Sequence, residues 1–184
     1  MNIALVSPYF HPHIGGVESR VLNTAKHMVR RAHSVTVFTS LLPDTKETES
    51  YESVEIKRVK PALIFYKTPI TPKLNRMLRN YDVVDAHSPP PIHSYYAACA
   101  CKAHKIPFVL TYHCDLEIPS LLGKIIVGIY NKTLGYYTMK NSDKIIVTTA
   151  SYAATSRALW KYNTTVIPTG VDTNIFKPDD KKRN

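Results

Sequence analysis

The sequence lacks the features that mark membrane-spanning and secreted proteins. Its apolar runs all fall short of the roughly 18 to 20 residues that a spanning helix needs. The N-terminus has neither the basic start nor the small-residue cleavage site of a signal peptide. These absences predict a cytoplasmic protein.

Cysteine is scarce, and the common nucleotide-binding fingerprints are missing. The three cysteines, Cys99, Cys101 and Cys114, are odd in number and lack zinc-site spacing, so we expect reduced thiols. Neither G-x-G-x-x-G nor G-x-x-x-x-G-K-[ST] occurs, which excludes the usual dinucleotide and P-loop signatures. No helix-turn-helix, RRM or zinc-finger pattern is present, so nucleic acid is not an expected partner.

Positive charge is what the chain has in excess. Its 24 Lys and Arg residues outnumber 14 Asp and Glu residues, which gives a formal net charge of +10. Such an excess attracts polyanions, including an anionic membrane or an anionic substrate. With 184 residues and 44% apolar composition, the chain has the size and core-forming residues of one domain.

Short apolar runs alternate with longer amphipathic stretches along the chain. The runs predict strands at 3–7, 34–39, 54–59, 82–86, 108–112, 144–148 and 164–167. Helices are predicted at 17–31, 72–79, 92–104, within 121–140 and at 151–159, and loops at 41–53 and 61–72. This order predicts a Rossmann-like α/β fold: a mostly parallel sheet of about seven strands with helices on both faces.

Polar side chains follow the predicted strands at their carboxyl ends, where such sheets bind ligands. The residues at this rim are Tyr9, His87, His113 and Ser151. A histidine can share a proton near neutral pH, and a neutral imidazole can hydrogen-bond a sugar hydroxyl. The alternative for each rim histidine is a hydrogen-bonded loop residue without a functional role.

Gly15 and Gly16 lie in the loop between the first strand and the first helix. Without a Cβ they can adopt positive φ and allow a phosphate or sugar to approach the main chain closely. The free amides of the following helix N-terminus also favour an anion. An ordinary strand-to-helix turn is the alternative.

Two motifs together carry a family resemblance. The first is P-Y-F-H-P-H-I-G-G-V-E, from Pro8 to Glu18, and the second is V-I-P-T-G-V-D-T-N-I-F-K-P, from Val166 to Pro178. The pair resembles the N-terminal domain of glycosyltransferase family 4, retaining enzymes of the GT-B fold that use nucleotide-activated sugars. The second motif departs from the family pattern at Thr169, where asparagine is usual. The first resembles enzymes that transfer N-acetylglucosamine or mannose to phosphatidylinositol lipids.

The resemblance implies roles for particular residues. It places an active-site histidine at His113, near the reacting sugar, and implies that Gly15, Gly16, Tyr9, His87 and Ser151 line the substrate cleft. It implies no metal and no bound cofactor beyond the nucleotide-diphosphate sugar itself, and the sequence contains no D-x-D pair.

Family members continue into a second, donor-binding domain. We therefore expect residues 1–176 to form the acceptor-side domain and 177–184 to be a charged tail or the start of a linker. The chain is then a fragment, or a subunit completed by another chain, with little activity by itself.

The segment from Leu121 to Lys140 combines apolar residues with three lysines. It resembles the membrane-contacting segment of family members with lipid acceptors, and its composition suits an interfacial helix on an anionic membrane surface. The protein would then be peripheral on the inner face. A core helix is the alternative.

Two other functions remain open. One is a non-catalytic module that recruits a partner transferase to membranes, and the other is half of a GT-B sugar-nucleotide epimerase.

Overall fold

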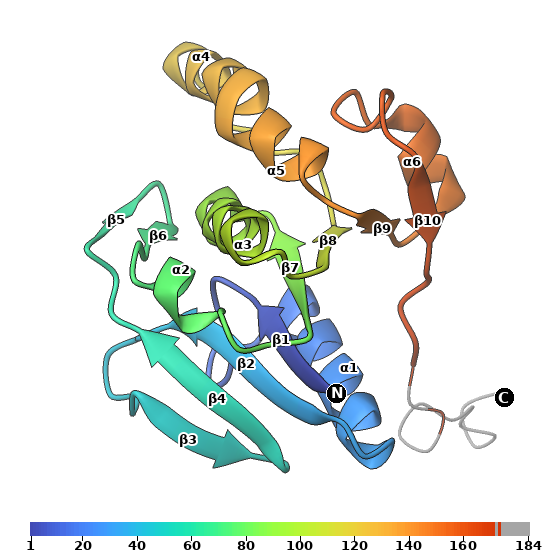
Figure 1. Cartoon of the computed structure of the whole chain (residues 1–184). Coiled ribbons are helices and arrows are strands. Elements are labelled where there is room, and N and C mark those ends of the chain that lie inside the picture. The colour runs from blue at the N-terminus through green and yellow to red at the C-terminus, as the bar shows by residue number, and fades with distance from the viewer. Residues whose placement is uncertain (172, 174–184) are drawn as a thin grey trace, which may run out of the picture.

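An eight-stranded sheet forms the centre of the computed structural model, which describes residues 1–171 and 173 (Figure 1). The strand order is β10-β9-β8-β7-β1-β2-β4-β3, and every pairing is parallel except that of β3 with β4. The strands are β1 (Asn2–Val6), β2 (Ser34–Ser40), β3 (Thr48–Tyr51), β4 (Val54–Val59), β7 (Val83–Ser88), β8 (Phe108–Tyr112), β9 (Lys144–Val147) and β10 (Thr164–Val166).

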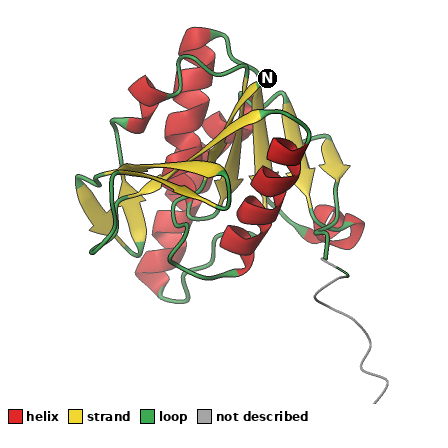
Figure 2. Cartoon of the chain, turned by 90° about the horizontal axis from the view of Figure 1, so that it is seen from below, coloured by secondary structure: helices red, strands yellow, loops and turns green. Residues whose placement is uncertain are grey.

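The chain reverses its direction of travel across the sheet between β1 and β7. It passes from β1 to β2 and β4, then returns to pair β7 on the other side of β1 before adding β8, β9 and β10. Helix α1 (Gly16–Arg30) and helix α3 (Pro91–His104) follow β1 and β7 and cover opposite faces (Figures 1 and 2). Such a reversal opens a crevice at the carboxyl ends of the strands.

Alternation along β1 explains the two cores. Ile3 and Leu5 pack with Val21 and Ala25 of α1. Ala4 and Val6 belong to the other cluster, together with the small residues Ala97, Ala98, Ala100 and Cys101 of α3. Because successive side chains of a strand point to opposite faces, a central strand buried on both sides is apolar throughout.

The remaining helices are α2 (Leu74–Met77), α4 (Leu121–Tyr130), α5 (Tyr136–Lys140) and α6 (Ala150–Thr155), with a π-helical stretch, η1 (Asn131–Gly135), joining α4 to α5. Helices α2 and α5 pack against α3. A separate hairpin, β5 (Leu63–Phe65) and β6 (Thr68–Ile70), lies beside α3 through β6. Among the described residues, no helix is both long enough and apolar enough to cross a membrane.

The α/β fold with a mostly parallel sheet is confirmed, and all seven predicted strands are present. The loops predicted at 41–53 and 61–72 are wrong in part, since β3 and the β5–β6 hairpin form there. Both hairpins turn through two residues of positive φ, Glu52-Ser53 and Tyr66-Lys67. Such turns usually carry Asn or Gly, so neither place shows a turn signal in the sequence.

The predicted helices at 72–79 and 151–159 are too long. Helix α2 ends at Met77, and the Arg79 side chain donates to the Arg76 carbonyl. Helix α6 ends at Thr155 because Ser156 is extended, with its hydroxyl held by Asp115. The predicted tail at 177–184 and Asp172 of the second motif lie outside the described residues.

Candidate active site

The two rim histidines lie in direct contact at the carboxyl ends of β7 and β8. His87 Nδ1 and His113 Nε2 are 2.9 Å apart, a hydrogen-bond distance, and the two rings are stacked. The backbone amide of His113 also donates to the Ser88 carbonyl, which continues the β7–β8 pairing past the last residue of β8. The imidazole of His113 is therefore fixed by both its main chain and its ring.

Both imidazoles are neutral at physiological pH. His87 is 1% exposed, and its burial, helped by the nearby charge of Arg20, lowers its pKa to about 3. Burial also lowers the pKa of the half-buried His113 to about 3, with further contributions from His87 and Arg20. A pair of neutral rings can share one proton in a hydrogen bond, so one ring donates and the other accepts.

A carboxylate lies directly below the histidine pair on the same face of the sheet. Asp85 Oδ1 accepts a hydrogen bond from Thr111 Oγ1 at 2.8 Å, and Asp85 Oδ2 is 3.7 Å from His87 Nε2. Burial raises the pKa of Asp85 to about 6, while Thr111 and the charge of Arg20 oppose that rise. The Thr111 hydroxyl and the Arg20 charge thus favour the ionised form of Asp85.

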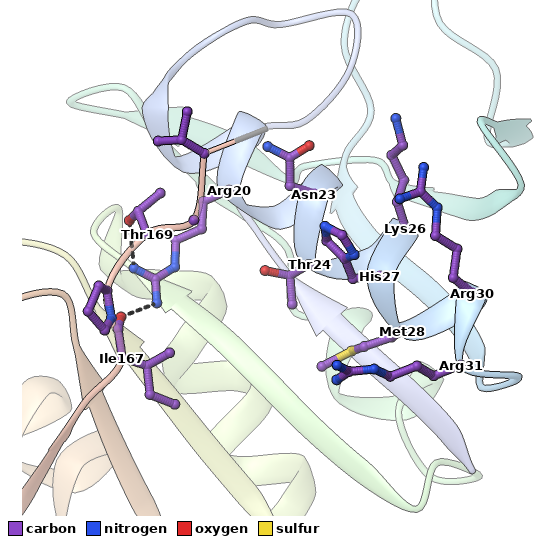
Figure 3. Close-up of a pocket in the computed structure, with 13 residues that line it drawn as sticks. Arg20, Asn23, Thr24, Lys26, His27, Met28, Arg30, Arg31, Ile167 and Thr169 are labelled. Carbon is purple, nitrogen blue, oxygen red and sulfur yellow. Dashed lines mark hydrogen bonds between the residues drawn. The ribbon is translucent and has the colours of Figure 1, made fainter. Parts of the chain in front are cut away.

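Arg20 brings a positive charge to this cluster from α1. Its guanidinium donates to the Ile167 carbonyl at 3.1 Å and to Thr169 Oγ1 at 3.0 Å, so it joins α1 to the segment after β10 (Figure 3). Beside it, a pocket of about 300 Å³ lies between α1 and residues 167–171. Among the described residues, its charged lining residues are Arg20, Lys26, Arg30 and Arg31, and no carboxylate, nor His87 or His113, lines it.

The glycine loop leads into α1 without the positive φ that its glycines could adopt. Gly15 caps the helix at φ −163°, and no described glycine has a positive φ, so that expectation is wrong. The chain turns instead through an extended cap residue, which any amino acid can supply. A Cβ on Gly15 would collide with the Glu18 carboxylate, whereas one on Gly16 would meet nothing within 4 Å. The first turn of α1 is therefore open at Gly16.

Tyr9 and Ser151 have other partners. The Tyr9 hydroxyl donates to the Lys67 carbonyl at 2.8 Å. Ser151 is exposed in the first turn of α6, with its hydroxyl 3.2 Å from that of Thr149. Within the described part of the chain, no hydrogen bond joins either residue to the histidine pair.

Asp85, Thr111 and Arg20 were not among the predicted site residues. A signal was present for Asp85, because it lies two residues before His87 and must share its face of the strand. Arg20 lies one turn after Gly16 on α1, which places both residues on neighbouring parts of one helix surface. Among the described residues, no group of three or more His, Cys, Asp or Glu side chains could hold a metal ion.

Comparison with known proteins gives the family and the fold. The profile of Glycosyltransferase Family 4 matches residues 14–175. No curated protein sequence matches the chain. Among solved structures, sucrose-phosphate synthase (tll1590) from Thermosynechococcus elongatus is similar over 99% of this chain and 51% of its own, with 18% identity and a TM-score of 0.66.

Other solved structures agree with this match. Alr3699/HepE from Anabaena, in complex with UDP and glucose, is similar over 98% of this chain and 47% of its own, at 18% identity and a TM-score of 0.64. The catalytic domain of starch synthase IV from Arabidopsis thaliana, bound to ADP and acarbose, matches 94% of this chain and 52% of its own at 10% identity, with a TM-score of 0.59. The chain spans about half the length of these structures, and its fold is that of one half of a GT-B enzyme. Because the family profile covers most of its length, the chain belongs to glycosyltransferase family 4.

Proposed function

We propose that this chain is the acceptor-side domain of a retaining, metal-independent glycosyltransferase that moves a sugar from a nucleotide-diphosphate sugar to an acceptor. The observation that carries the proposal is the neutral His113 imidazole, half-buried against His87 beside the point where the sheet reverses its order. Family membership supports the reaction class, and the UDP and glucose bound to Alr3699/HepE support the class of donor.

The residues of the cluster suit this reaction in distinct ways. The neutral ring of His113 can hydrogen-bond a sugar hydroxyl without the cost of burying a charge. The open first turn of α1 at Gly16 offers free backbone amides and a positive helix dipole to a phosphate or an acceptor group. Positioning and electrostatic stabilisation of this kind lower the barrier when the second domain holds the donor's diphosphate.

The test is the replacement of His113 in a complete two-domain protein. His113→Ala should lower turnover of the sugar nucleotide at least tenfold, equivalent to about 1.4 kcal/mol of barrier. His104→Ala is the matched control, because His104 is exposed at the far end of α3. Unchanged turnover in His113→Ala would remove this side chain from the mechanism. Consumption of the sugar nucleotide without any acceptor would instead indicate an epimerase.

We further propose that the acceptor is a lipid and that the domain lies on an anionic membrane surface. Of the residues in α4, only Gly123 is buried, whereas the side chains of Leu121, Leu122, Ile125 and Ile129 are more than half exposed. Between Glu117 and Asp143 the chain carries three lysines and no acidic residue. A helix with this pattern suits the boundary between lipid headgroups and acyl chains.

The β5–β6 hairpin presents a second exposed apolar surface flanked by lysines. Its residues Leu63, Ile64, Phe65 and Tyr66 are each at least half exposed, and Lys60 and Lys67 flank them. Binding to mixed phosphatidylcholine and phosphatidylglycerol vesicles, measured by co-sedimentation, should fall at least fivefold in Leu121→Ser/Ile125→Ser. Trp160→Ser is the control, since Trp160 is an equally exposed aromatic residue beyond α6. Equal binding by wild type and both variants would refute the membrane contact while leaving the transfer reaction untouched.

A further inference from the structure

The hydrogen bond between the two site histidines has a direction, and a neighbouring residue sets it. We infer that Asp85 is a positioning residue that fixes which nitrogens of His87 and His113 carry their protons. The inference deepens the proposed function, because it determines which kind of sugar group His113 can contact. It is carried by the arrangement of four side chains, Asp85 and His87 of β7, Thr111 of β8, and His113 directly after β8.

The starting point is the contact of 2.9 Å between His87 Nδ1 and His113 Nε2. Each neutral imidazole carries one proton on one of its two nitrogens. Two arrangements satisfy the contact: either His87 donates from Nδ1, or His113 donates from Nε2. The two arrangements differ at the remaining nitrogens. In the first, His87 Nε2 has a lone pair and His113 Nδ1 carries a proton, and in the second the reverse holds.

The surroundings of His87 Nε2, the buried nitrogen of the pair, distinguish the two arrangements. His87 Nε2 is sealed from solvent, makes no hydrogen bond, and lies 3.7 Å from Asp85 Oδ2. If Nε2 lacked a proton, its lone pair would face a carboxylate in a site with little water, where like charges repel strongly. If Nε2 carries the proton, the N–H dipole points toward that negative charge. The second arrangement is therefore the stable one.

The protonation of His87 determines which nitrogen of His113 carries its proton. With its proton on Nε2, His87 accepts at Nδ1, and His113 must donate from Nε2. The remaining nitrogen of His113, Nδ1, then carries a lone pair. This atom makes no hydrogen bond to a described residue and is not among the sealed polar atoms. His113 thus offers an acceptor, which suits a hydroxyl group of a sugar and not an oxygen of a phosphate or carbonyl.

The charged and titratable groups around the pair favour this state at neutral pH. Asp85 comes from β7, and Arg20 of α1 is close enough to stabilise its ionised form. From β8, the Thr111 hydroxyl donates to Asp85 Oδ1, which leaves Oδ2 to face His87. Burial, with a smaller contribution from the charge of Arg20, lowers the pKa of both imidazoles and so disfavours a second proton on either ring.

Long-range proton–nitrogen NMR of the 184-residue chain at pH 7 reads the protonated nitrogen of each histidine directly. We expect both His87 and His113 to carry the proton on Nε2 in the wild type. In Asp85→Asn, Thr111 holds the amide oxygen at the Oδ1 position, so the amide NH₂ faces His87 Nε2. The hydrogen bond between the two rings should then reverse its direction, with both rings protonated on Nδ1.

The control is Thr111→Val, which removes the hydroxyl but leaves the carboxylate facing His87, so both rings should keep their protons on Nε2. In the double variant Asp85→Asn/Thr111→Val, the amide has lost the group that orients it, and the reversal should be incomplete. A wild-type spectrum with His87 protonated on Nδ1 overturns the inference, even if the variants do not fold. The measurement needs no sugar transfer, so its outcome is separate from that of the His113→Ala assay.

Discussion

The buried histidine of α3, His93, makes stability depend on pH in a way that can be calculated. Its ring is 0% exposed, and Nε2 lies 3.2 Å from both Ser40 Oγ and Thr71 Oγ1. Burial lowers its pKa to about 3, whereas an unfolded chain has a histidine pKa of about 6.5. The stability that it contributes is therefore complete above pH 6.5 and is lost as the pH falls from 6.5 toward 3. At pH 5 His93 is protonated in the unfolded state but not in the folded state, which lowers the free energy of unfolding by about 2 kcal/mol.

The perturbation is His93→Gln, which keeps a side chain that can bond the two hydroxyls but cannot titrate. Urea unfolding at pH 8 and at pH 5 gives the loss of unfolding free energy for each protein. His87 and His113 also lose stability in acid and Asp85 gains some, but these contributions are common to both proteins and cancel in the comparison. The wild type should lose about 2 kcal/mol more than the variant. The reasoning is refuted if the two losses agree to within about 0.5 kcal/mol.

Three further predictions test the packing and the glycine loop. Gly123→Ala should lower the free energy of unfolding by about 1–3 kcal/mol in thermal denaturation, because its Cβ would collide with the Ile118 side chain. Gly128→Ala, where a Cβ would meet nothing within 4 Å, should raise the free energy of unfolding by up to about 1 kcal/mol. Equal effects of the two substitutions would contradict the geometry. Asp115→Ala should cost about 2–4 kcal/mol in urea unfolding, since one oxygen of Asp115 accepts hydrogen bonds from three hydroxyls; a loss below about 1 kcal/mol would mean that these bonds are not formed together. Gly16→Ala should not lower the melting temperature, because space is open there, and should lower turnover of the complete enzyme; full turnover would argue against a ligand close to this main chain.

The sequence predicted the architecture well because the buried strands are apolar and lie between amphipathic helices. The strand from Ile3 onward and the one ending at Tyr112 need no tertiary information to be recognised. The two hairpins escaped prediction since their turns, Glu52-Ser53 and Tyr66-Lys67, use residues that rarely adopt positive φ. Their conformation is set by strand pairing and not by the turn residues themselves.

The site was predicted less completely than the fold. The rule that ligands bind at strand carboxyl ends drew attention to both His87 and His113, and the structure brings them to hydrogen-bond distance. The partners of this pair could not be read from the sequence with the same ease. Arg20 comes from helix α1, which covers the same face of the sheet as Asp85, and its distance from the rings depends on how α1 docks.

The two hydrogen bonds from Arg20 to Ile167 and Thr169 join the guanidinium of α1 to a segment that is far away in the sequence. That cation also sustains the ionised carboxyl of Asp85 and discourages a second proton on either ring. If residues 167–169 shifted far enough to release the guanidinium, its contribution to the pKa of Asp85, His87 and His113 would be lost. The position of residues 167–169 is therefore coupled through Arg20 to the pKa of Asp85, which at about 6 lies nearest to neutral pH.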